Sequence, residues 1–370
     1  MTDDAALEAT NPLGALERLR VQNFTVFSDA DFTFSPGLNI IVGENGTGKT
    51  HLLKLAYAAT RVLYPDKVGR PVANEELPIA LTNKLLNVFL PDTLGRLRRH
   101  VGPGVPPTAK VDVVFQSADK GFSFEISTAE WVGIIAAPAN RPANPTGGPA
   151  YLPPREVVSL VPAFVSDYER TSIRFEETYF DLAKLLLARP RRGPRNPRTT
   201  ALLAPLETAM GGGLESDELG RLYLRFSDGW KIEAPLVSEG YRKLATLAYL
   251  IQNGSLALHG SLFWDEPEAN LNPRLMGALA DTLVQLAADG VQIFIATHSL
   301  FMMREIALRL DRGRARGQSV PVRYFSFSRD GTGITVETAD DIEGLGMIAS
   351  LDAALKQDDA LERLYWETRS

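Results

Sequence analysis

The feature that most constrains this chain is a glycine-rich loop between an apolar strand and a helix. In "LNIIVGENGTGKTHLLKLAYAATRVLY" the apolar residues from Leu38 to Val42 predict a strand, and the leucines and alanines after Thr50 predict a helix. Residues 43–50 match G-x-x-x-x-G-K-[ST] in the strand-loop-helix context that this motif requires. The alternative is a glycine turn with an incidental lysine, and the flanking elements argue against it. We therefore predict a phosphate-binding loop in an α/β fold.

Each position of this loop has a physical role. The glycines let the backbone curl, so that successive N–H groups and a helix N-terminus point at one phosphate. Lys49 neutralises the β- and γ-phosphates, and the hydroxyl of Thr50 is placed to bind Mg²⁺. The expected cofactors are therefore ATP and Mg²⁺. The residues expected to bind the nucleotide here are Gly43, Glu44, Asn45, Gly46, Thr47, Gly48, Lys49, Thr50 and His51.

Two adjacent acids end a second apolar run. The segment "SLFWDEPEANLNP" covers residues 261–273 and places Asp265 and Glu266 after a predicted strand. In P-loop ATPases an acid at this position holds Mg²⁺ through water, which is the role predicted for Asp265. Glu266 lies one residue further along, where it can orient and polarise the water that attacks the γ-phosphate. A solvated strand end is the alternative, and the phosphate loop disfavours it.

Two further stretches narrow the class of protein. "QIFIATHSLFMM", residues 292–303, is an apolar strand ending at His298, which would face the same edge of the sheet. In "LVSEGYRKLATLAYLI", residues 236–251, Ser238 is expected to cap a helix, and Gly240 removes a side chain where something must approach closely. A core or capping histidine and a plain capped helix are the structural alternatives.

In this order, the motifs GENGTGKT, SEGYRK, FWDEPEANLNP and ATHS resemble those of the ATP-binding-cassette (ABC) superfamily, in the branch with the SMC, RecF and OLD-type ATPases. The resemblance covers residues 16–64 and 219–327. Because the sequence shows no sustained heptad pattern and no spaced acidic set, we expect a stand-alone ATPase without coiled-coil arms or a nuclease domain. The implied fold is an α/β P-loop NTPase with an N-terminal antiparallel β lobe, a mainly parallel core sheet flanked by helices, and a mixed α/β insertion.

The same resemblance implies roles for individual residues. Glu266 would be the general base and His298 the γ-phosphate sensor, with Lys49 as the third catalytic residue. Ser238 and Gly240 would cap the γ-phosphate of an ATP held by a second subunit, so that a head-to-tail dimer closes on two ATP molecules. The residues that would lie near the adenine are Asn23, Phe24 or Phe27, and those of the loop that crosses between subunits are Asn270, Leu271 and Asn272.

The sequence departs from the family at two places. Glu239 stands where the family commonly has glycine, and no glutamine lies at the position of the family's Q-loop. The segment "AYLPPREVVSLVPAF" is similar to the "PPR" element of OLD-like ATPases, which would bring Arg155 or Glu156 near the nucleotide. Which residue takes the Q-loop role therefore stays open.

The predicted domain organisation is an ATPase head interrupted by an insertion. The head comprises residues 1–65 and 219–370, and residues 66–218 form a mixed α/β, largely helical lid or arm without a heptad pattern. The elements expected in the insertion and after His298 are a helix at about 74–90, strands at 110–116 and 121–127, a loop at 137–149, amphipathic helices near 155–163 and 172–188, a β-hairpin at 322–338 and a final helix at about 345–367.

Composition limits the possible partners. The chain has no cysteine, no apolar run long enough for a transmembrane helix, and an acidic start unlike a signal peptide, so we expect a cytoplasmic protein without membrane insertion. With a net charge of −6, any nucleic-acid contact needs a local basic patch. The loop Arg189 to Arg198 is one candidate and the cluster from Arg96 to His100 another, and a solvated loop is the alternative.

Three functions remain possible on this basis. The first is an ATPase that dimerises on ATP and acts as a switch or motor in DNA repair or anti-phage (antiviral) defence, controlling a separate protein effector or gripping nucleic acid. The second is the energising subunit of a membrane transporter. The third is a binding module in which nucleotide is only structural, although the presence of Lys49, Glu266 and His298 argues against it.

Overall fold

The computed structural model gives the arrangement of most of the chain. The residues that it describes are 13–64, 73–128, 130–139, 148–161, 163–170, 174–190, 193–218, 220–256, 260–329, 331, 333–346, 348, 357 and 359.

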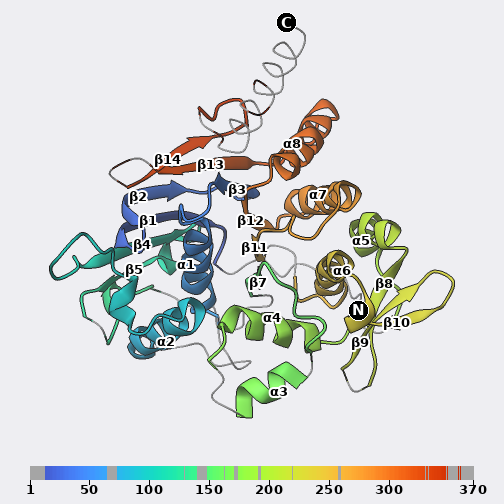
Figure 1. Cartoon of the computed structure of the whole chain (residues 1–370), viewed down its shortest axis with the longest axis horizontal. Helices are drawn as coiled ribbons and strands as arrows, with labels where there is room; N and C mark the ends of the chain where they lie inside the picture. Colours follow the sequence, from blue (N-terminus) through green and yellow to red (C-terminus); the bar gives the residue numbers. More distant parts are fainter. Residues whose placement is uncertain are drawn as a thin grey trace, which may run out of the picture.

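An antiparallel sheet forms one lobe of the molecule (Figure 1). Its central strand β4 has the sequence AKVDVVF, and its burial alternates along the strand as expected when one face packs on a core. The sheet buries the side chains that face the phosphate-loop helix. The strands, in the order β2-β1-β4-β5-β6, are β2 (Phe27–Thr33), β1 (Leu16–Phe24), β4 (Ala109–Phe115), β5 (Phe122–Ile126) and β6 (Gly133–Ala136).

The second, six-stranded sheet is the core of the fold. Five of its strands run parallel, and β14 pairs antiparallel with β13 at one edge. Strands β11 and β12 are buried along their whole length, as expected for parallel strands covered on both faces. The strands, in the order β14-β13-β3-β12-β11-β7, are β14 (Ile334–Ala339), β13 (Val322–Arg329), β3 (Leu38–Gly43), β12 (Gln292–Thr297), β11 (Ser261–Asp265) and β7 (Ala150–Leu152).

The helices cover the core sheet on both sides (Figure 1). They are α1 (Lys49–Arg61), α2 (Leu77–Phe89), α3 (Ala163–Arg170), α4 (Glu177–Leu187), α5 (Pro197–Met210), α6 (Glu239–Gln252), α7 (Pro273–Ala288) and α8 (Leu300–Ala315). Short 3₁₀ turns are η2 (Asn74–Glu76), η3 (Leu94–Leu97), η4 (Ala118–Lys120) and η5 (Ala234–Leu236). A small antiparallel sheet, in the order β10-β9-β8, contains β10 (Lys231–Glu233), β9 (Leu222–Phe226) and β8 (Gly212–Ser216).

Two hydrophobic clusters lie on the two faces of the core sheet. Strand β3 contributes to both, because Leu38 and Ile40 pack in the cluster with α5 to α8, and Ile41 packs in the cluster with α1 and the lobe. On the lobe side Phe263 and Phe294 stack on neighbouring strands, with ring centroids 4.5 Å apart. The sheet is thereby fixed between two packed layers, which holds the ends of its strands rigidly.

The expected fold class is confirmed, with an antiparallel lobe and a mainly parallel core sheet between helices. The described range of α2, the strands β4 and β5, and the antiparallel pair β13 and β14 also lie where they were predicted. The final helix predicted at 345–367 lies almost entirely outside the described residues. No described helix is long and apolar enough to span a membrane.

The helix predicted near residues 155–163 is wrong. The chain turns there, and helix α3 begins only at Ala163. Pro153 and Pro154 restrict the backbone before this segment. The carboxylate of Glu156 then accepts hydrogen bonds from the amide (3.2 Å) and the hydroxyl (2.8 Å) of Ser159, which favours a turn.

The described part of the range 66–218, predicted as an insertion, contributes strands to both larger sheets. It supplies β4, β5 and β6 to the lobe sheet and β7 to the core sheet, so both sheets of the head are completed by it. The division into a head (1–65 and 219–370) and a lid or arm remains a proposal for the helical part, α2 to α5.

Candidate nucleotide and magnesium site

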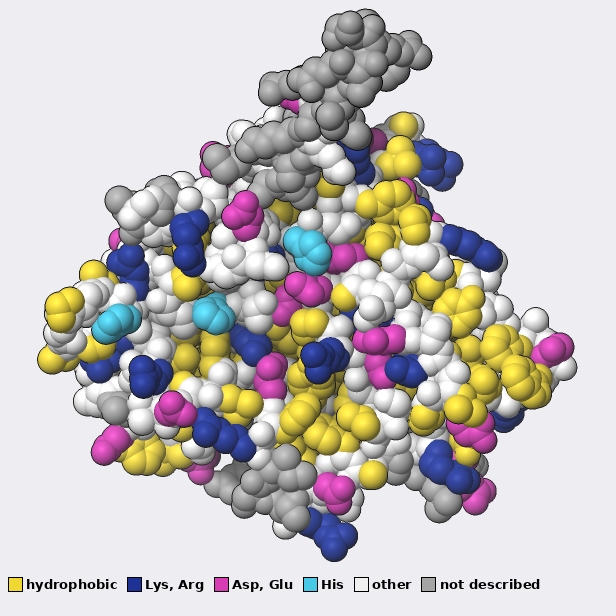
Figure 2. Space-filling model, viewed as in Figure 1, with side chains coloured by type: hydrophobic (Ala, Val, Ile, Leu, Met, Phe, Trp, Pro, Cys, Tyr) yellow, Lys and Arg dark blue, Asp and Glu magenta, His cyan; other side chains and the backbone are white. Residues whose placement is uncertain are grey.

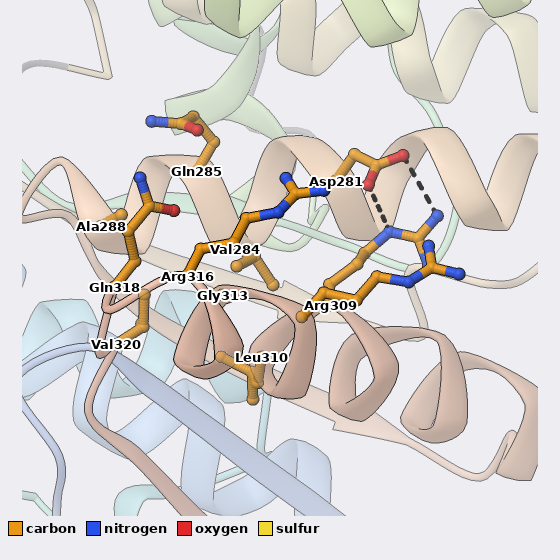
Figure 3. A pocket seen from close by; sticks show the side chains of 11 residues that line it. Asp281, Val284, Gln285, Ala288, Arg309, Leu310, Gly313, Arg316, Gln318 and Val320 are labelled. Atoms are coloured by element: carbon orange, nitrogen blue, oxygen red, sulfur yellow. Dashed lines mark hydrogen bonds and ion pairs between the residues drawn. The ribbon is translucent and has the colours of Figure 1, made fainter.

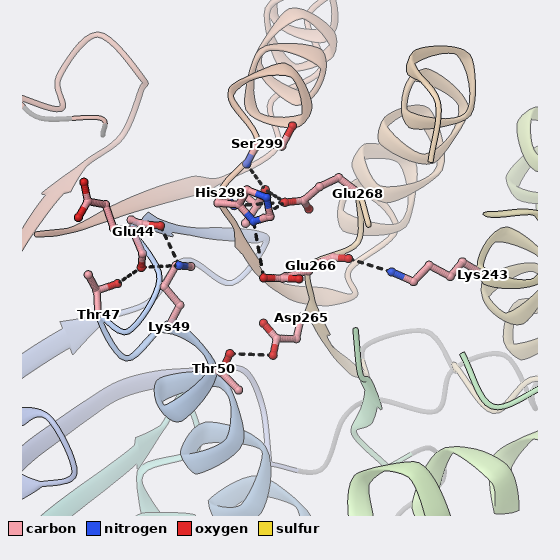
Figure 4. Close-up of polar contacts among 12 residues, drawn as sticks. Glu44, Thr47, Lys49, Thr50, Lys243, Asp265, Glu266, Glu268, His298 and Ser299 are labelled. Carbon is pink, nitrogen blue, oxygen red and sulfur yellow. Dashed lines mark hydrogen bonds and ion pairs between the residues drawn. The ribbon is translucent and has the colours of Figure 1, made fainter. Parts of the chain in front are cut away.

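The predicted site residues meet at one edge of the core sheet. The phosphate loop follows β3, Asp265 ends β11, and His298 follows β12, and these three strands are parallel neighbours in the order β3-β12-β11. Because the carboxyl ends of parallel strands share one edge, segments more than 200 residues apart are brought into one site (Figure 4). In Figure 2 acidic and histidine side chains gather near the middle of this face.

The phosphate loop needs glycine at two positions for steric reasons. Gly48 has φ 96°, and a Cβ atom there would lie 2.5 Å from Cγ2 of Val26. At Gly43, with φ 151°, a Cβ atom would lie 2.4 Å from the carbonyl oxygen of Phe327. No side chain caps the N-terminus of α1 at Gly48. The first amides of this helix therefore face the loop, as an anion site requires.

The ammonium of Lys49 rests on the loop itself. It donates hydrogen bonds to the carbonyl oxygens of Gly43 (2.7 Å) and Glu44 (2.9 Å). Thr47 braces the same turn by donating from its hydroxyl to the carbonyl of Glu44 (2.8 Å). Burial lowers the pKa of Lys49, and the nearby Asp265 carboxylate opposes that shift. A phosphate group would provide the anion that this buried cation lacks.

A hydroxyl and a carboxylate lie together where Mg²⁺ is expected. The hydroxyl of Thr50 donates a 2.8 Å hydrogen bond to Oδ2 of Asp265, which is 2% exposed. Burial raises the pKa of Asp265 to about 6, although the Thr50 hydrogen bond works against the shift. A buried carboxylate beside a hydroxyl oxygen is suited to Mg²⁺, because Mg²⁺ prefers oxygen ligands. The bound cation would also neutralise the negative charge of the buried carboxylate.

Glu266 and His298 approach each other over the phosphate loop. Oε1 of Glu266 lies 3.6 Å from Nδ1 of His298, and both side chains are partly exposed (Figure 4). Glu266 has φ 49°, a left-handed conformation that costs of order 1–3 kcal/mol in a residue other than glycine. Its amide donates to the carbonyl of Ala296 on β12 (2.8 Å), which turns the chain sharply at the end of β11.

Sequence reasoning missed Glu268, which anchors the histidine. Its carboxylate is 6% exposed and accepts hydrogen bonds from the hydroxyl of Thr297 (2.7 Å) and the amide of His298 (3.2 Å). Oε1 of Glu268 also lies 3.5 Å from Nδ1 of His298. The sequence feature that could have indicated Glu268 is its place in Asp-Glu-Pro-Glu, two residues after the predicted base.

Sequence reasoning also missed Lys243. Its ammonium donates a 3.0 Å hydrogen bond to the carbonyl oxygen of Glu266, and the residue is 3% exposed. The available signal was its position on the buried face of α6, in phase with Gly240, Leu244 and Leu247. A lysine there stands where an apolar residue is expected.

The structure places Ser238 and Gly240 at the start of α6. Ser238 is exposed at the N-cap position, but its side chain makes no capping hydrogen bond. Gly240 is buried, and a Cβ atom there would lie 2.6 Å from the carbonyl oxygen of Asn270. The close approach predicted at Gly240 is therefore made by this chain's own loop. Whether Ser238 and Gly240 also bind nucleotide stays a prediction.

The loop predicted to cross between subunits has two residues with structural roles. Leu271 is buried in the core, and the side chain of Asn272 caps α7 by accepting from the amide of Leu275 (3.0 Å). Asn270 is exposed and has φ 64°. Of the three, Asn270 has the freest side chain for an intersubunit contact.

The aromatic residues predicted near the adenine are buried instead. Phe24 is 0% exposed and packs edge-on against Phe89, with ring centroids 5.6 Å apart. Its place near the adenine stays a prediction. Phe27 is buried beside Gly48. Asn23 has φ 51°, and its side-chain amide donates to the carbonyl of Thr108 (3.4 Å). The lobe core requires these rings, which removes them from the surface.

His51, the third residue of α1, has its ring tilted against Phe89, with ring centroids 5.9 Å apart. Burial lowers its pKa, and its Nδ1 atom is buried without a hydrogen-bond partner among the described residues. The ring thus lies between α1 and α2. Its predicted contact with nucleotide remains untested.

The Pro-Pro-Arg segment emerges beside Asp265. Strand β7 pairs in parallel with β11 and aligns Leu152 with Trp264, so the residues after Leu152 reach the same edge of the sheet. Arg155 is exposed there. Glu156 instead forms a 2.7 Å ion pair with Arg242 on α6. Of the two residues, Arg155 has the more exposed side chain, and the approach of either to the nucleotide stays a prediction.

The predicted basic loop is partly neutralised. Arg189 donates to the carbonyl of Glu218 (2.8 Å), Arg195 pairs with Glu207 (2.7 Å), and Arg198 pairs with Asp289 (2.9 Å). Arg191 and Arg192 lie outside the described residues. In the second cluster, Arg98 donates to the carbonyls of Pro106 (3.1 Å) and Ser127 (3.0 Å), which gives it a structural role.

A cleft of about 240 Å³ lies away from this site, between α7 and α8 (Figure 3). Arg309 in its wall is held by Asp281 on α7 and by Glu305. The cleft opens at the C-terminal half of α8, whereas α8 begins at Leu300, beside His298. It is therefore separate from the phosphate loop.

Comparisons with protein families match two parts of the chain. Residues 155–304 match a family described as "AAA domain, putative AbiEii toxin, Type IV TA system", and residues 18–71 match one described as "AAA domain". These ranges contain Asp265 and the phosphate loop, respectively.

Curated relatives match over short stretches. The DNA replication and repair protein RecF of Salmonella typhi is 37% identical over 76 residues, covering 19% of this chain and 20% of that protein. The glutamine transport ATP-binding protein GlnQ of Geobacillus stearothermophilus is 34% identical over 68 residues, covering 18% of this chain and 28% of that protein. The chain thus spans well under a third of the length of these two relatives.

Solved structures match over most of the fold. A crystal structure of an SMC head bound to the C-winged helix domain of ScpA has a TM-score of 0.54 at 14% identity, covering 90% of this chain and 100% of that one. An SMC head with an extended coiled coil, bound to the C-terminal domain of ScpA derived from Pyrococcus furiosus, has a TM-score of 0.51 at 14% identity, covering 94% and 99%. At this identity the likeness establishes the fold.

Proposed function

We propose that this chain, an ABC-type P-loop ATPase of the SMC/RecF-like kind, binds Mg²⁺ and ATP at the carboxyl edge of its core sheet and hydrolyses the ATP. The observation that carries the proposal is the convergence of three strand ends. The Thr50 to Asp265 hydrogen bond (2.8 Å) and the Glu266 to His298 approach (3.6 Å) lie at the same edge of the sheet as the phosphate loop.

Each residue has a separate chemical task in this proposal. Lys49 would exchange its two loop carbonyls for phosphate oxygens, and the amides of α1 would hold the same phosphates. Thr50 and Asp265 would hold Mg²⁺, which neutralises the developing charge on the phosphates. Glu266 would accept a proton from the attacking water, and His298 would hydrogen-bond to the γ-phosphate.

The exposure of the site supports a second copy as its lid. Glu266 and His298 have side chains that are 34% and 54% exposed, whereas phosphoryl transfer is favoured when water is excluded. Ser238 and Asn270 are exposed near this edge. We propose that a head-to-tail homodimer closes on two ATP molecules, with Ser238 and Gly240 of each copy covering the nucleotide of the other.

The biological role that we propose is a switch or motor in DNA repair or anti-phage defence. Support comes from the matches to RecF and to a family described as a putative toxin of a toxin-antitoxin system. The SMC head bound to a ScpA domain supports a separate protein partner. The cytoplasm is the proposed location, and Arg191 and Arg192 are the proposed non-specific nucleic-acid contacts.

The match to GlnQ favours a second candidate, the energising subunit of a transporter. That match covers 18% of this chain, whereas the fold likeness to an SMC head covers 90%. The transporter is therefore the less favoured candidate. Hydrolysis stimulated by a membrane partner would favour the transporter, and hydrolysis stimulated by DNA or a soluble effector would favour the switch.

Light scattering tests the proposed dimer. The Glu266→Gln variant keeps the shape of the side chain but removes the proton acceptor, so bound ATP would persist. Its molar mass is expected to double when Mg²⁺ and ATP are added, and the Lys49→Ala variant is expected to remain monomeric. A Glu266→Gln protein that binds ATP but keeps the monomer mass at micromolar concentration would overturn the dimer.

A further inference from the structure

The base proposed above is held by its main chain as well as by its side chain. Glu266 adopts φ 49°, and its carbonyl oxygen accepts hydrogen bonds from the ammonium of Lys243 (3.0 Å) and from the amide of Ala269 (3.1 Å). Rotation of the peptide after Glu266 would break both bonds. The direction of the Glu266 carboxylate therefore depends on groups that never touch the nucleotide.

Lys243 is unusual because a buried cation normally pairs with a carboxylate. The residue is 3% exposed, and its pKa is lowered by burial. Glu268 is the carboxylate with the largest opposing effect, yet Oε2 of Glu268 is buried without a hydrogen-bond partner among the described residues. The ammonium is directed instead at the carbonyl of Glu266 (Figure 4). If Lys243 served only to neutralise Glu268, its ammonium would not need to point at the carbonyl oxygen of Glu266.

The first two turns of α6 contact residues 266–271, here called the acidic loop, at two points. Gly240 packs against the carbonyl of Asn270, where a Cβ atom would come within 2.6 Å, and Lys243 bonds the carbonyl of Glu266. Gly240 and Lys243 are one helical turn apart and lie on the same buried face. Residues 266–271 and the start of α6 are thereby fixed to each other.

We propose that Lys243 is a positioning residue for hydrolysis, which holds Glu266 in its left-handed conformation and ties it to the helix that begins at Ser238. This inference rests on the proposed role of Glu266 as the base. A displacement of the exposed start of α6, such as contact with a second copy, would move the carbonyl of Glu266 through Lys243. The same helix, α6, would thus contact the nucleotide of the second copy and position Glu266 in its own subunit.

Kinetics of Lys243→Met test the positioning role. Methionine keeps much of the length and volume of lysine but removes the donor. We expect kcat to fall by about 10- to 100-fold, because small misplacements of a reacting group have effects of this size. The Kd for ATP is expected to stay within about twofold, since the phosphate loop is untouched. Lys243→Arg, which can still donate to the carbonyl, is expected to recover part of kcat.

Lys84→Met is the matched control. Lys84 is also buried, at 8% exposed, and pairs with Glu177 (2.7 Å) and Asp181 (3.1 Å) between α2 and α4, away from Glu266. We expect it to lower thermal stability with little change in kcat for the folded protein. Wild-type kcat in Lys243→Met, or a loss of kcat no larger than in Lys84→Met, would overturn the inference.

Hydrogen exchange separates this inference from the proposed function. Without nucleotide, the amides of residues 266–271 are expected to exchange faster in Lys243→Met than in the wild type or in Lys84→Met. This measurement needs no hydrolysis. If the wild-type protein turned over no ATP, the proposed function would fail and exchange would still decide the role of Lys243. Unchanged exchange in Lys243→Met would overturn that role even in an active enzyme.

Discussion

Thr50 donates a 2.8 Å hydrogen bond from its hydroxyl to Oδ2 of Asp265, joining the first turn of α1 to the end of β11. The two residues are 215 positions apart in sequence. Thr50 is the last residue of the phosphate-loop motif, and Asp265 directly precedes the proposed base, Glu266. The bond brings the two expected Mg²⁺ ligands into contact. It is the most direct structural link between the two motifs.

Removing the Thr50 hydroxyl is expected to weaken Mg²⁺ binding. Thr50→Ala deletes one oxygen ligand and leaves Asp265 without its hydrogen bond. We expect the Mg²⁺ concentration for half-maximal ATP hydrolysis to rise by about tenfold or more, because losing one charge-assisted contact of this kind costs about 1.5–3 kcal/mol. Thr60→Ala is the control, since its hydroxyl bonds only to the carbonyl of Ala56 in the same helix. An equal effect of both changes would contradict the assignment.

Acid is expected to weaken the Mg²⁺ site in the range set by Asp265. Burial raises the pKa of this carboxyl to about 6, so it becomes protonated and neutral as the pH falls through about 6. The apparent affinity for Mg²⁺ should decline below that pH. Isothermal titration with Mg²⁺ and a non-hydrolysable ATP analogue between pH 5 and pH 8 measures this. An affinity that is constant across the range would contradict the prediction.

The same shift predicts how the stability of the nucleotide-free protein depends on pH. The folded chain holds a proton on Asp265 at pH values where the unfolded chain, with a pKa of 3.8, has lost it. The contribution to stability is therefore present below about pH 4 and is lost as the pH rises through about 6. Relative to Asp265→Asn, the wild type should lose up to about 3 kcal/mol over this range in urea unfolding.

A methyl group at Gly240 is expected to disturb the position of Glu266, although Gly240 does not contact Glu266. Its Cβ atom would lie 2.6 Å from the carbonyl of Asn270, so Gly240→Ala must displace either α6 or the acidic loop. We expect a loss of at least about 1 kcal/mol in stability together with lower kcat. Gly277→Ala in α7 is the control, because its Cβ atom would meet only side-chain ends at 3.3 and 3.4 Å. Unchanged kcat in Gly240→Ala would contradict the packing argument.

Truncating Glu268 is expected to release His298. Glu268→Ala removes the acceptor for the Thr297 hydroxyl and the His298 amide. We expect kcat to fall by about tenfold or more through loss of orientation, while Glu268→Gln, which keeps one acceptor oxygen, should lose less. Steady-state hydrolysis at saturating ATP measures both variants. Equal activity of Glu268→Ala and the wild type would show that His298 is oriented by other contacts.

Much of the fold could be predicted because its signals are local. The phosphate loop has a fixed pattern between strand and helix, and β11 and β12 are uninterrupted apolar runs that end in polar residues. The parallel arrangement then places Lys49, Asp265 and His298 at one edge. The alternation in β4 and in β13 with β14 likewise indicates strands from sequence alone.

The remaining features depend on contacts between distant segments. No local pattern shows that β4 to β7, from the predicted insertion, complete both sheets of the head. The burial of Phe24 depends on its packing against Phe89, which lies 65 positions further along the chain. Lys243 and Glu268 acquire their roles only because α6, β12 and the acidic loop meet, which a linear sequence does not reveal.

The most direct test of the account is ATP hydrolysis by the wild type and the Glu266→Gln variant, with ATP binding measured on the same preparations. We expect Mg²⁺-dependent turnover by the wild type, and for Glu266→Gln a loss of at least about 100-fold in kcat with ATP affinity retained. Similar turnover by the two proteins would contradict the assignment of Glu266 as the base. A wild type that binds no ATP with Mg²⁺ present would contradict the phosphate site itself.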